Sequence, residues 1–203
     1  MVAVVNYGMG NIHSVAKALE AVGGDVVVTA SARDIERADH IVLPGVGSFA
    51  QGMRHLNELK LSEALYEQVM IRKKPFLGIC LGMQLVAKTG NEHGLTNGLG
   101  WISAKVVDLD VGSKDFKVPH MGWNDVEFVK DTLLFENIKS PATFYFVHSY
   151  HFVPEDKEVI TGLCDHGIKF VASVRMDNIH LVQFHPEKSQ KSGLQVLENF
   201  LSN

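Results

Sequence analysis

Short apolar runs alternate with amphipathic stretches along the first half of the chain, and this alternation most constrains the fold. The runs are Val2–Val5, Asp25–Thr29, Ile41–Leu43 and Pro75–Ile79. The intervening stretches have helical spacing or helix-start signals and cover Ile12–Val22, Ser31–Ala38, the residues after Ser48, Ser62–Arg72 and the segment that contains Gly82–Val86. Strands that are apolar on both faces, joined by helices, are typical of a parallel sheet covered on both sides.

The pattern changes after Ala104, where strands follow one another with little helix between them. We expect strands at Lys105–Leu109, Asp125–Val129, Thr143–Val147, Phe170–Val174 and His180–Phe184, and a last helix at Ser192–Leu201. No low-complexity linker or internal repeat separates the two halves. The sequence therefore predicts one α/β domain over residues 1–203, with a mostly parallel central sheet flanked by helices and an antiparallel extension.

Composition limits the classes of protein to which the chain can belong. The formal net charge is -4, without a basic block, which argues against a nucleic-acid partner. No apolar run approaches the ~18 residues of a membrane span, and the start carries no basic targeting region. The two cysteines, Cys80 and Cys164, are far apart and fit a reducing compartment. We therefore expect a cytoplasmic protein without a membrane partner.

The segment Gly78–Gly82, with the sequence GICLG, places Cys80 between two glycines where a strand gives way to a helix. Such a turn projects a nucleophile above the sheet, and the helix N-terminus behind it favours the thiolate. Free helix N–H groups, Leu81 among them, point to where an oxyanion would form. The alternative is that Cys80 is a small core residue, which is usual for an isolated cysteine. The flanking glycines favour the nucleophile.

A cysteine nucleophile needs a base and a group that orients the base. His185 ends an apolar strand and begins the sequence His185-Pro186-Glu187. Residues i and i+2 of an extended segment share a face, so Glu187 is expected beside the imidazole. Both could instead be ordinary turn residues. Their predicted place at the carboxyl edge of the sheet, where such folds bind ligands, favours the catalytic interpretation.

Three other patterns carry less information. Pro44–Ser48 follows a strand and precedes a helix, so it is either a tight turn or a second source of oxyanion N–H groups. Gly8 and Gly10 resemble the start of a dinucleotide fingerprint, but His13 occupies its third glycine position. The spacing of His and Cys matches no zinc site. We expect neither a cofactor nor a metal.

Six segments together resemble the glutaminase subunits of imidazole glycerol phosphate synthase, which are class I (triad) glutamine amidotransferases. The segments span most of the chain and are 6–15 (NYGMGNIHSV), 44–49 (PGVGSF), 78–84 (GICLGMQ), 119–124 (PHMGWN), 145–150 (YFVHSY) and 183–189 (QFHPEKS). The resemblance implies hydrolysis of glutamine to glutamate and ammonia, in which Cys80 is the nucleophile, His185 the base and then the acid, and Glu187 the orienting group. A γ-glutamyl thioester is the implied intermediate.

The resemblance also implies a set of binding residues. Leu81 and the strand containing Gly45, Val46 and Gly47 would serve the oxyanion, after a peptide of that strand reorients on binding the partner. The residues expected to hold glutamine are Gln84, Ser149 and Tyr150.

The resemblance further implies a partner. The ammonia would pass through a dry channel to a (β/α)₈-barrel cyclase, which forms imidazole glycerol phosphate and an aminoimidazole carboxamide ribotide in histidine biosynthesis. The residues that match family positions facing this heterodimeric partner are Asn11, Met121, Trp123, Tyr145 and Lys188. Met121 and Trp123 suit an interface core, although both could be core residues of this chain.

Three alternatives remain open from the sequence. A paralogous glutaminase that feeds a sugar amidotransferase for surface polysaccharide would carry nearly the same motifs. A cysteine hydrolase or chaperone of similar α/β fold would share the elbow cysteine, but Gln84 and the His185–Glu187 pair speak against it. A binding module without activity would leave Cys80 inert.

Overall fold

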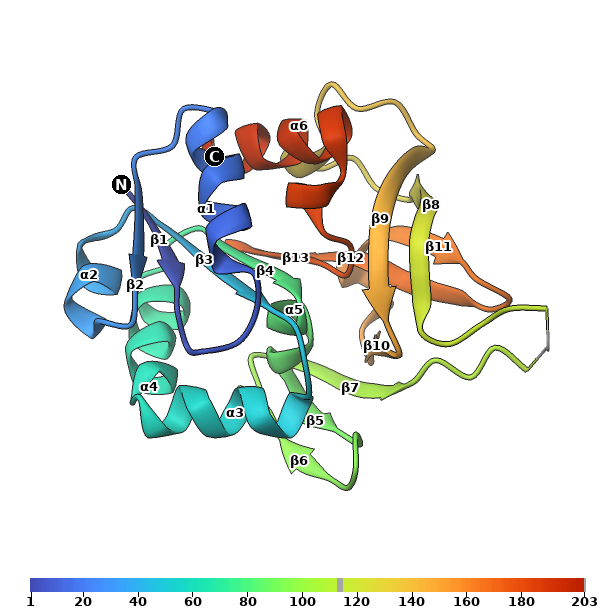
Figure 1. The fold of residues 1–203 in the computed structure, drawn as a ribbon, viewed down its shortest axis with the longest axis horizontal. Helices are drawn as coiled ribbons and strands as arrows, with labels where there is room; N and C mark the ends of the chain where they lie inside the picture. The colour runs from blue at the N-terminus through green and yellow to red at the C-terminus, as the bar shows by residue number, and fades with distance from the viewer. Residues whose placement is uncertain (113–114, 203) are drawn as a thin grey trace.

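The computed structural model describes residues 1–112 and 115–202 and contains two sheets. The larger sheet has nine strands in the order β2-β1-β3-β4-β13-β12-β11-β8-β9 (Figure 1). Its strands are β1 (Val2–Val5), β2 (Val26–Thr29), β3 (His40–Gly45), β4 (Phe76–Cys80), β8 (His120–Phe128), β9 (Ala142–His148), β11 (Ile160–Asp165), β12 (Lys169–Met176) and β13 (Ile179–Val182). The smaller sheet contains β10 (Tyr150–Pro154), β7 (Ile102–Asp108), β5 (Ala87–Gly90) and β6 (Thr96–Asn97).

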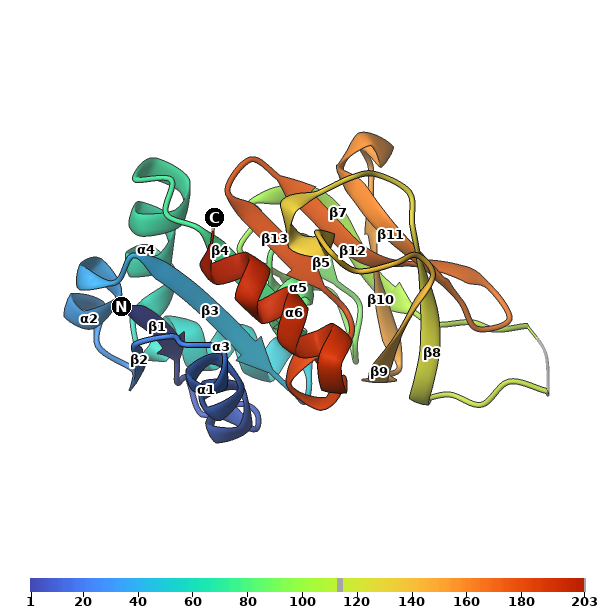
Figure 2. The ribbon, with the colours of Figure 1, turned by 90° about the horizontal axis from the view of Figure 1, so that it is seen from above.

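The helices and the shorter helical turns lie on both sides of the larger sheet. The α-helices are α1 (Ile12–Ala21), α2 (Ala32–Arg37), α3 (Phe49–Glu58), α4 (Leu61–Leu65), α5 (Leu81–Leu85) and α6 (Gln190–Leu201). A π-helical turn η1 (Tyr66–Ile71) continues α4, and the 3₁₀ turns are η2 (Leu133–Phe135), η3 (Lys157–Val159) and η4 (Pro186–Lys188). Figure 2 shows α1 and α6 side by side over one face of the sheet.

The expected mixture of parallel and antiparallel strands is confirmed. Strands β2, β1, β3, β4 and β13 pair in parallel, and β12, β11, β8 and β9 extend the sheet antiparallel from β13. The carboxyl ends of β3, β4 and β13 therefore meet at one edge. Phe76 pairs with Ile41 on one side and with Ile179 on the other, which fixes the register of these three strands.

Alternate residues of the central strands enter two separate cores. Val2 and Val4 pack with α1 and α6, whereas Ala3 and Val5 pack with α2, α3 and α4. This explains why the strands are apolar at every position. Full burial of each such valine, leucine or isoleucine contributes about 1.5–3 kcal/mol, so the two cores hold the central sheet rigid at its functional edge.

Several elements differ from the sequence-based expectation. The strand expected at Thr143–Val147 is present as β9, but after Ser149 the chain leaves the larger sheet and joins the smaller one as β10, which was not expected. Strands β5, β6 and β11 were not expected either. Strand β6 has only two polar residues, and β5 and β11 contain Gly90 and Gly162, which weaken the strand pattern. In the described part of the chain, no helix has both the length and the apolar character that crossing a bilayer requires.

Buried histidines make the fold sensitive to acid. Burial lowers the pKa of His120 to about 4, that of His148 to about 3 and that of His180 to about 4. In the unfolded chain each would have a pKa near 6.5, so below that pH the unfolded state binds more protons than the folded one. Stability is therefore present above pH ~6.5 and is lost as the pH falls towards these folded-state values.

We expect the free energy of unfolding to fall between pH 7 and pH 5, and His180→Leu to reduce that fall. A group whose pKa drops from 6.5 to about 4 accounts for roughly 1–2 kcal/mol of the decrease. Urea unfolding at several pH values measures the effect. The matched control is His13→Leu, since His13 is exposed on α1. An unchanged pH dependence in His180→Leu would contradict the assignment.

Candidate active site

Cys80 lies at the turn between β4 and α5, in a backbone conformation that L-residues rarely adopt. Its φ is 53° and its ψ is -107°. Glycines make this turn possible: a Cβ on Gly82 would lie 1.8 Å from the carbonyl oxygen of Leu43, and one on Gly78 would lie 2.9 Å from the carbonyl of Gly82. Strand, helix and the neighbouring β3 are therefore packed backbone against backbone, and the cysteine is held in a strained conformation at their junction.

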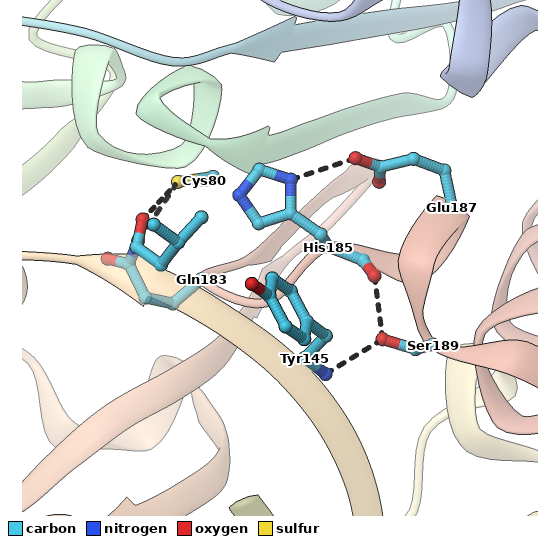
Figure 3. Close-up of polar contacts among 7 residues, drawn as sticks. Cys80, Tyr145, Gln183, His185, Glu187 and Ser189 are labelled. Atoms are coloured by element: carbon cyan, nitrogen blue, oxygen red, sulfur yellow. Dashed lines mark hydrogen bonds and ion pairs between the residues drawn. The ribbon is translucent and has the colours of Figure 1, made fainter. Parts of the chain in front are cut away.

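His185 and Glu187 form a buried pair beside Cys80 (Figure 3). His185 Nδ1 lies 2.8 Å from Glu187 Oε1, and the two side chains are 3% and 2% exposed. The contact matches the expectation, but its local structure does not. Glu187 belongs to the 3₁₀ turn η4, and His185 is the residue that precedes this turn. Pro186 begins the turn and brings the carboxylate back to the ring, so a shared strand face is not what pairs them.

The charges around His185 favour its protonated form. Burial lowers the pKa of His185, but the negative charges of Cys80 and Glu187 and their hydrogen bonds outweigh burial and raise the pKa to about 10. His185 Nε2 is buried without a hydrogen bond of normal geometry, and Figure 3 places it on the side of the ring that faces Cys80. A thiolate on Cys80 and an imidazolium on His185 therefore stabilise each other.

The backbone of His185 is fixed by β9. Its N–H donates to the carbonyl of Tyr145 at 2.9 Å. Its carbonyl accepts a hydrogen bond of 2.6 Å from Ser189 Oγ, which in turn accepts one of 3.0 Å from the N–H of Tyr145. These three bonds, two of which are drawn in Figure 3, fix the position of the His185 backbone relative to β9.

Gly45 lies opposite Cys80 in the β3–β4 register. Leu81 is the first residue of α5, so its N–H is one of the helix donors without an intrahelical partner. A Cβ on Gly45 would lie 2.1 Å from Tyr7 Oη, which is buried and makes no hydrogen bond. Only glycine fits here, and the backbone of β3 consequently comes close to the nucleophile.

A cavity of about 520 Å³ opens above these residues. It is lined by Val46, Gly47, Ser48, Cys80, Leu81, Gln84, Glu92, Pro119, Val147, His148, Ser149, Tyr150 and Lys188. The sequence-predicted binding residues therefore all line the cavity except Gly45, which lies opposite Cys80 in the β3–β4 register. Hollows of about 690 Å³ and about 710 Å³ lie elsewhere on the described surface, but Cys80 lines neither of them.

Sequence reasoning missed two polar residues of this site. Glu92 Oε2 accepts a hydrogen bond of 2.6 Å from the N–H of Phe49, at the start of α3, and lines the cavity. It lies in an irregular loop without a motif, so no sequence signal indicated it. Gln183 Nε2 lies 3.6 Å from Cys80 Sγ. Its position two residues before His185 was a signal, but it was quoted only as part of the resemblance.

The residues expected at a partner interface lie on the surface. Met121 is 63% and Trp123 49% exposed, so the alternative that they are core residues is wrong. Trp123 packs edge-on against Tyr145 with ring centroids 5.9 Å apart, and Lys188 Nζ lies 5.5 Å from the centre of the Tyr145 ring. We call Met121, Trp123, Tyr145 and Lys188 the aromatic patch. Asn11 is exposed in front of α1.

Within residues 1–112 and 115–202, no group of three or more His, Cys, Asp or Glu side chains is arranged to hold a metal ion. The chemistry available to the site is that of a thiolate, an imidazole, a carboxylate and backbone N–H groups.

Comparison with known proteins gives matches over the whole chain. Residues 3–203 match the model of the family described as glutamine amidotransferase class-I. The chain is 47% identical over 201 residues to "Imidazole glycerol phosphate synthase subunit HisH 1" of Campylobacter jejuni strain RM1221, covering 99% of each chain. It is 48% identical over 198 residues to "Imidazole glycerol phosphate synthase subunit HisH" of Aquifex aeolicus strain VF5, covering 97% of this chain and 94% of the relative.

Solved structures resemble the fold at lower identity. One described as a glutamine amidotransferase superposes with a TM-score of 0.78 at 17% identity, covering 100% of this chain and 98% of that one. A structure described as PurLQS from Thermotoga maritima gives a TM-score of 0.75 at 19% identity, covering 99% of this chain and 97% of that one. At these identities the likeness concerns the fold alone.

The strained turn predicts that position 80 tolerates glycine better than alanine. We expect Cys80→Gly to be more stable than Cys80→Ala by about 1 kcal/mol, because glycine adopts a positive φ without strain. Urea unfolding of both variants measures the difference. At Lys17, exposed within α1, the same pair should show the opposite order, since alanine favours a helix over glycine by about 1 kcal/mol. If Cys80→Ala were the more stable variant, the turn would not be strained.

Proposed function

This chain belongs to the glutamine amidotransferase class-I family, and we propose on that premise that it hydrolyses glutamine with Cys80, His185 and Glu187 as its catalytic triad. The chain is the glutaminase subunit of an imidazole glycerol phosphate synthase, and its ammonia serves histidine biosynthesis. The observation that carries the triad is the buried 2.8 Å contact between His185 and Glu187, with the free nitrogen of the ring turned to Cys80.

In the first half-reaction, the Cys80 thiolate attacks the side-chain carbonyl carbon of glutamine and forms a C–S bond. The carbonyl electron pair moves to the oxygen, which receives hydrogen bonds from the N–H of Leu81 and from the backbone of Gly45, Val46 and Gly47. His185 then donates its proton to the nitrogen, the C–N bond breaks, and ammonia leaves. The product on the enzyme is a γ-glutamyl thioester.

In the second half-reaction, His185 takes a proton from water, whose oxygen attacks the thioester carbon. The C–S bond breaks, its electron pair returns to the Cys80 sulfur, and glutamate leaves. Glu187 keeps Nδ1 protonated, so that Nε2 faces Cys80 throughout. The high pKa of His185 suits the start of the cycle, when the ring is an acid, and it falls once the thiolate charge is consumed.

The walls of the cavity offer groups that complement the amino-acid end of glutamine. Glu92 supplies a carboxylate for the α-ammonium group, and Gln84 supplies an amide beside the nucleophile. Ser149 and Tyr150 lie at the break between β9 and β10, where the chain passes from the larger sheet to the smaller one, and both residues line the cavity. This arrangement favours an amino acid over a simple amide.

The partner in this proposal is a cyclase subunit that takes up the ammonia, and we propose that it is a (β/α)₈ barrel seated on the aromatic patch. Large exposed aromatic groups are typical of interface centres. The patch adjoins the cavity, because Lys188 belongs to both. Ammonia that leaves through this contact avoids bulk water, where it would become ammonium. Asn11 would extend the interface.

The same proposal includes the organisation and location of the chain. Residues 1–203 form one glutamine amidotransferase domain, because the nine-stranded sheet runs through both halves of the sequence. We place the protein in the cytoplasm, because the pathway it serves uses soluble nucleotides. The chemistry requires neither a cofactor nor a metal.

Substitution of the triad should abolish glutamine hydrolysis without unfolding the chain. We expect Cys80→Ala and His185→Ala to reduce glutaminase kcat by at least ~10³-fold, and Glu187→Gln to cost roughly 10–100-fold less than either. Ammonia release in the presence of a cyclase partner measures the effect. Cys164→Ala is the matched control, because Cys164 is buried and burial raises its pKa to about 12. Full activity of Cys80→Ala would refute the mechanism.

The aromatic patch should bind the cyclase. We expect the isolated chain to be a poor glutaminase that the cyclase and its nucleotide ligand activate, and Trp123→Ala to weaken the complex at least ~tenfold in Kd. Titration calorimetry measures the binding. Tyr66→Ala is the control, since Tyr66 is an aromatic residue of similar exposure, 50%, outside the patch. Activation by a sugar amidotransferase in place of the cyclase would favour the surface-polysaccharide alternative.

A further inference from the structure

Gln183 is a polar side chain with no exposed surface, placed between the end of β13 and His185. Complete burial of a carboxamide is costly unless its groups are hydrogen-bonded. Its side chain makes two contacts, one to Gln84 and one to the sulfur of Cys80. The mechanism above assigns it no role, although it lies against the reacting atom.

The hydrogen bonds around Gln183 determine which end of its amide faces the sulfur. The carbonyl oxygen of Tyr150 can only accept, so the atom of Gln84 that lies 2.9 Å from it must be the nitrogen Nε2. The same nitrogen lies 3.0 Å from Gln183, so it donates its second hydrogen to Gln183 Oε1. The remaining end of Gln183 is therefore its NH₂ group, and this group faces Cys80 Sγ at 3.6 Å.

The sulfur thus has different partners in its two protonation states. As a thiol it points towards the carbonyl oxygen of Val147, 3.9 Å away, to which only a protonated sulfur can donate. As a thiolate it has no hydrogen to donate and accepts from Gln183 Nε2. A hydrogen bond made to the charged form of a group favours that form.

We propose that Gln183 is a catalytic residue, which donates an N–H hydrogen bond to the Cys80 thiolate, and that Gln84 holds the Gln183 amide in the orientation this requires. The bond acts twice in each turnover. It stabilises the thiolate that attacks glutamine, and it stabilises the thiolate that leaves when water has added to the thioester and the C–S bond breaks. Its role in turnover rests on the proposed function, but its effect on the reactivity of the sulfur does not.

The test compares two variants that remove the donor in different ways. Gln183→Met keeps the length of the side chain and removes both polar groups. Gln183→Glu keeps an oxygen that accepts from Gln84 and replaces the NH₂ group by a second oxygen. The rate of Cys80 alkylation by iodoacetamide is followed against pH by peptide mass spectrometry, which separates Cys80 from Cys164.

We expect the midpoint of the alkylation profile to move up by about one pH unit in Gln183→Met, which makes alkylation about tenfold slower at pH values below the midpoint of the unmodified chain. Gln183→Glu should move the midpoint at least as far, because a carboxylate next to the sulfur repels the thiolate. A purely structural role of Gln183 would lower stability and leave the midpoint unchanged. Thr161→Val is the matched control, since it removes a buried hydrogen bond of 2.8 Å to Ser173 away from Cys80.

An unchanged midpoint in Gln183→Met overturns the inference, whatever Gln183→Glu does, and so does an unchanged midpoint in Gln183→Glu if Gln183→Met fails to fold. Circular dichroism and thermal unfolding identify a folding failure. The outcome is independent of the proposed function. If the variants show the expected midpoint shifts but the unmodified chain hydrolyses no glutamine with a cyclase present, the proposed function fails and the bond between Gln183 and Cys80 stands.

Discussion

The close approach of three backbones at Gly82 is the constraint on which the rest of the site depends. The Cα of Gly82 lies so near the Leu43 carbonyl that a methyl group would reach within 1.8 Å of its oxygen. This contact ties α5 to β3 and pulls the end of β4 into the turn that gives Cys80 a φ of 53°. Strain of this kind costs about 1–3 kcal/mol and persists only where the surrounding packing enforces it. The two cores on either side of the sheet supply that packing.

A second constraint is the burial of charge beside the nucleophile. His185 and Glu187 are almost completely buried, and such a pair is stable only when each charge has a partner. Glu187 contacts Nδ1 of the His185 ring, and the Cys80 thiolate lies on the side of Nε2. Removing one member leaves an unpaired charge inside the protein. The pKa of His185 is about 10 for this reason, although burial alone would lower it.

The sequence predicted the order of the central elements well, because strands buried on both faces leave a continuous apolar pattern. Gly78, Cys80 and Gly82 indicated the elbow for a similarly local reason. The sequence did not predict how His185 reaches Glu187, because a 3₁₀ turn and an extended segment both fit one tripeptide. It also missed Glu92, whose role depends on a contact with α3 across 43 residues of sequence. Contacts between distant segments leave no periodic signal, and the break of the chain at Ser149 left none either.

The base and the aromatic patch share one residue of one strand. The side chain of Tyr145 packs against Trp123 and Lys188 on the surface, whereas its backbone N–H and carbonyl hold Ser189 and His185. Met121 and Trp123 are in turn paired with Val147 and Tyr145 across β8 and β9, and Val147 offers its carbonyl to Cys80. A partner protein that docks on the patch therefore contacts the strand that holds the backbone of the base and lies against the sulfur of the nucleophile. Because both contacts belong to β9, any displacement of this strand would act on the hydrogen bonds of His185 directly.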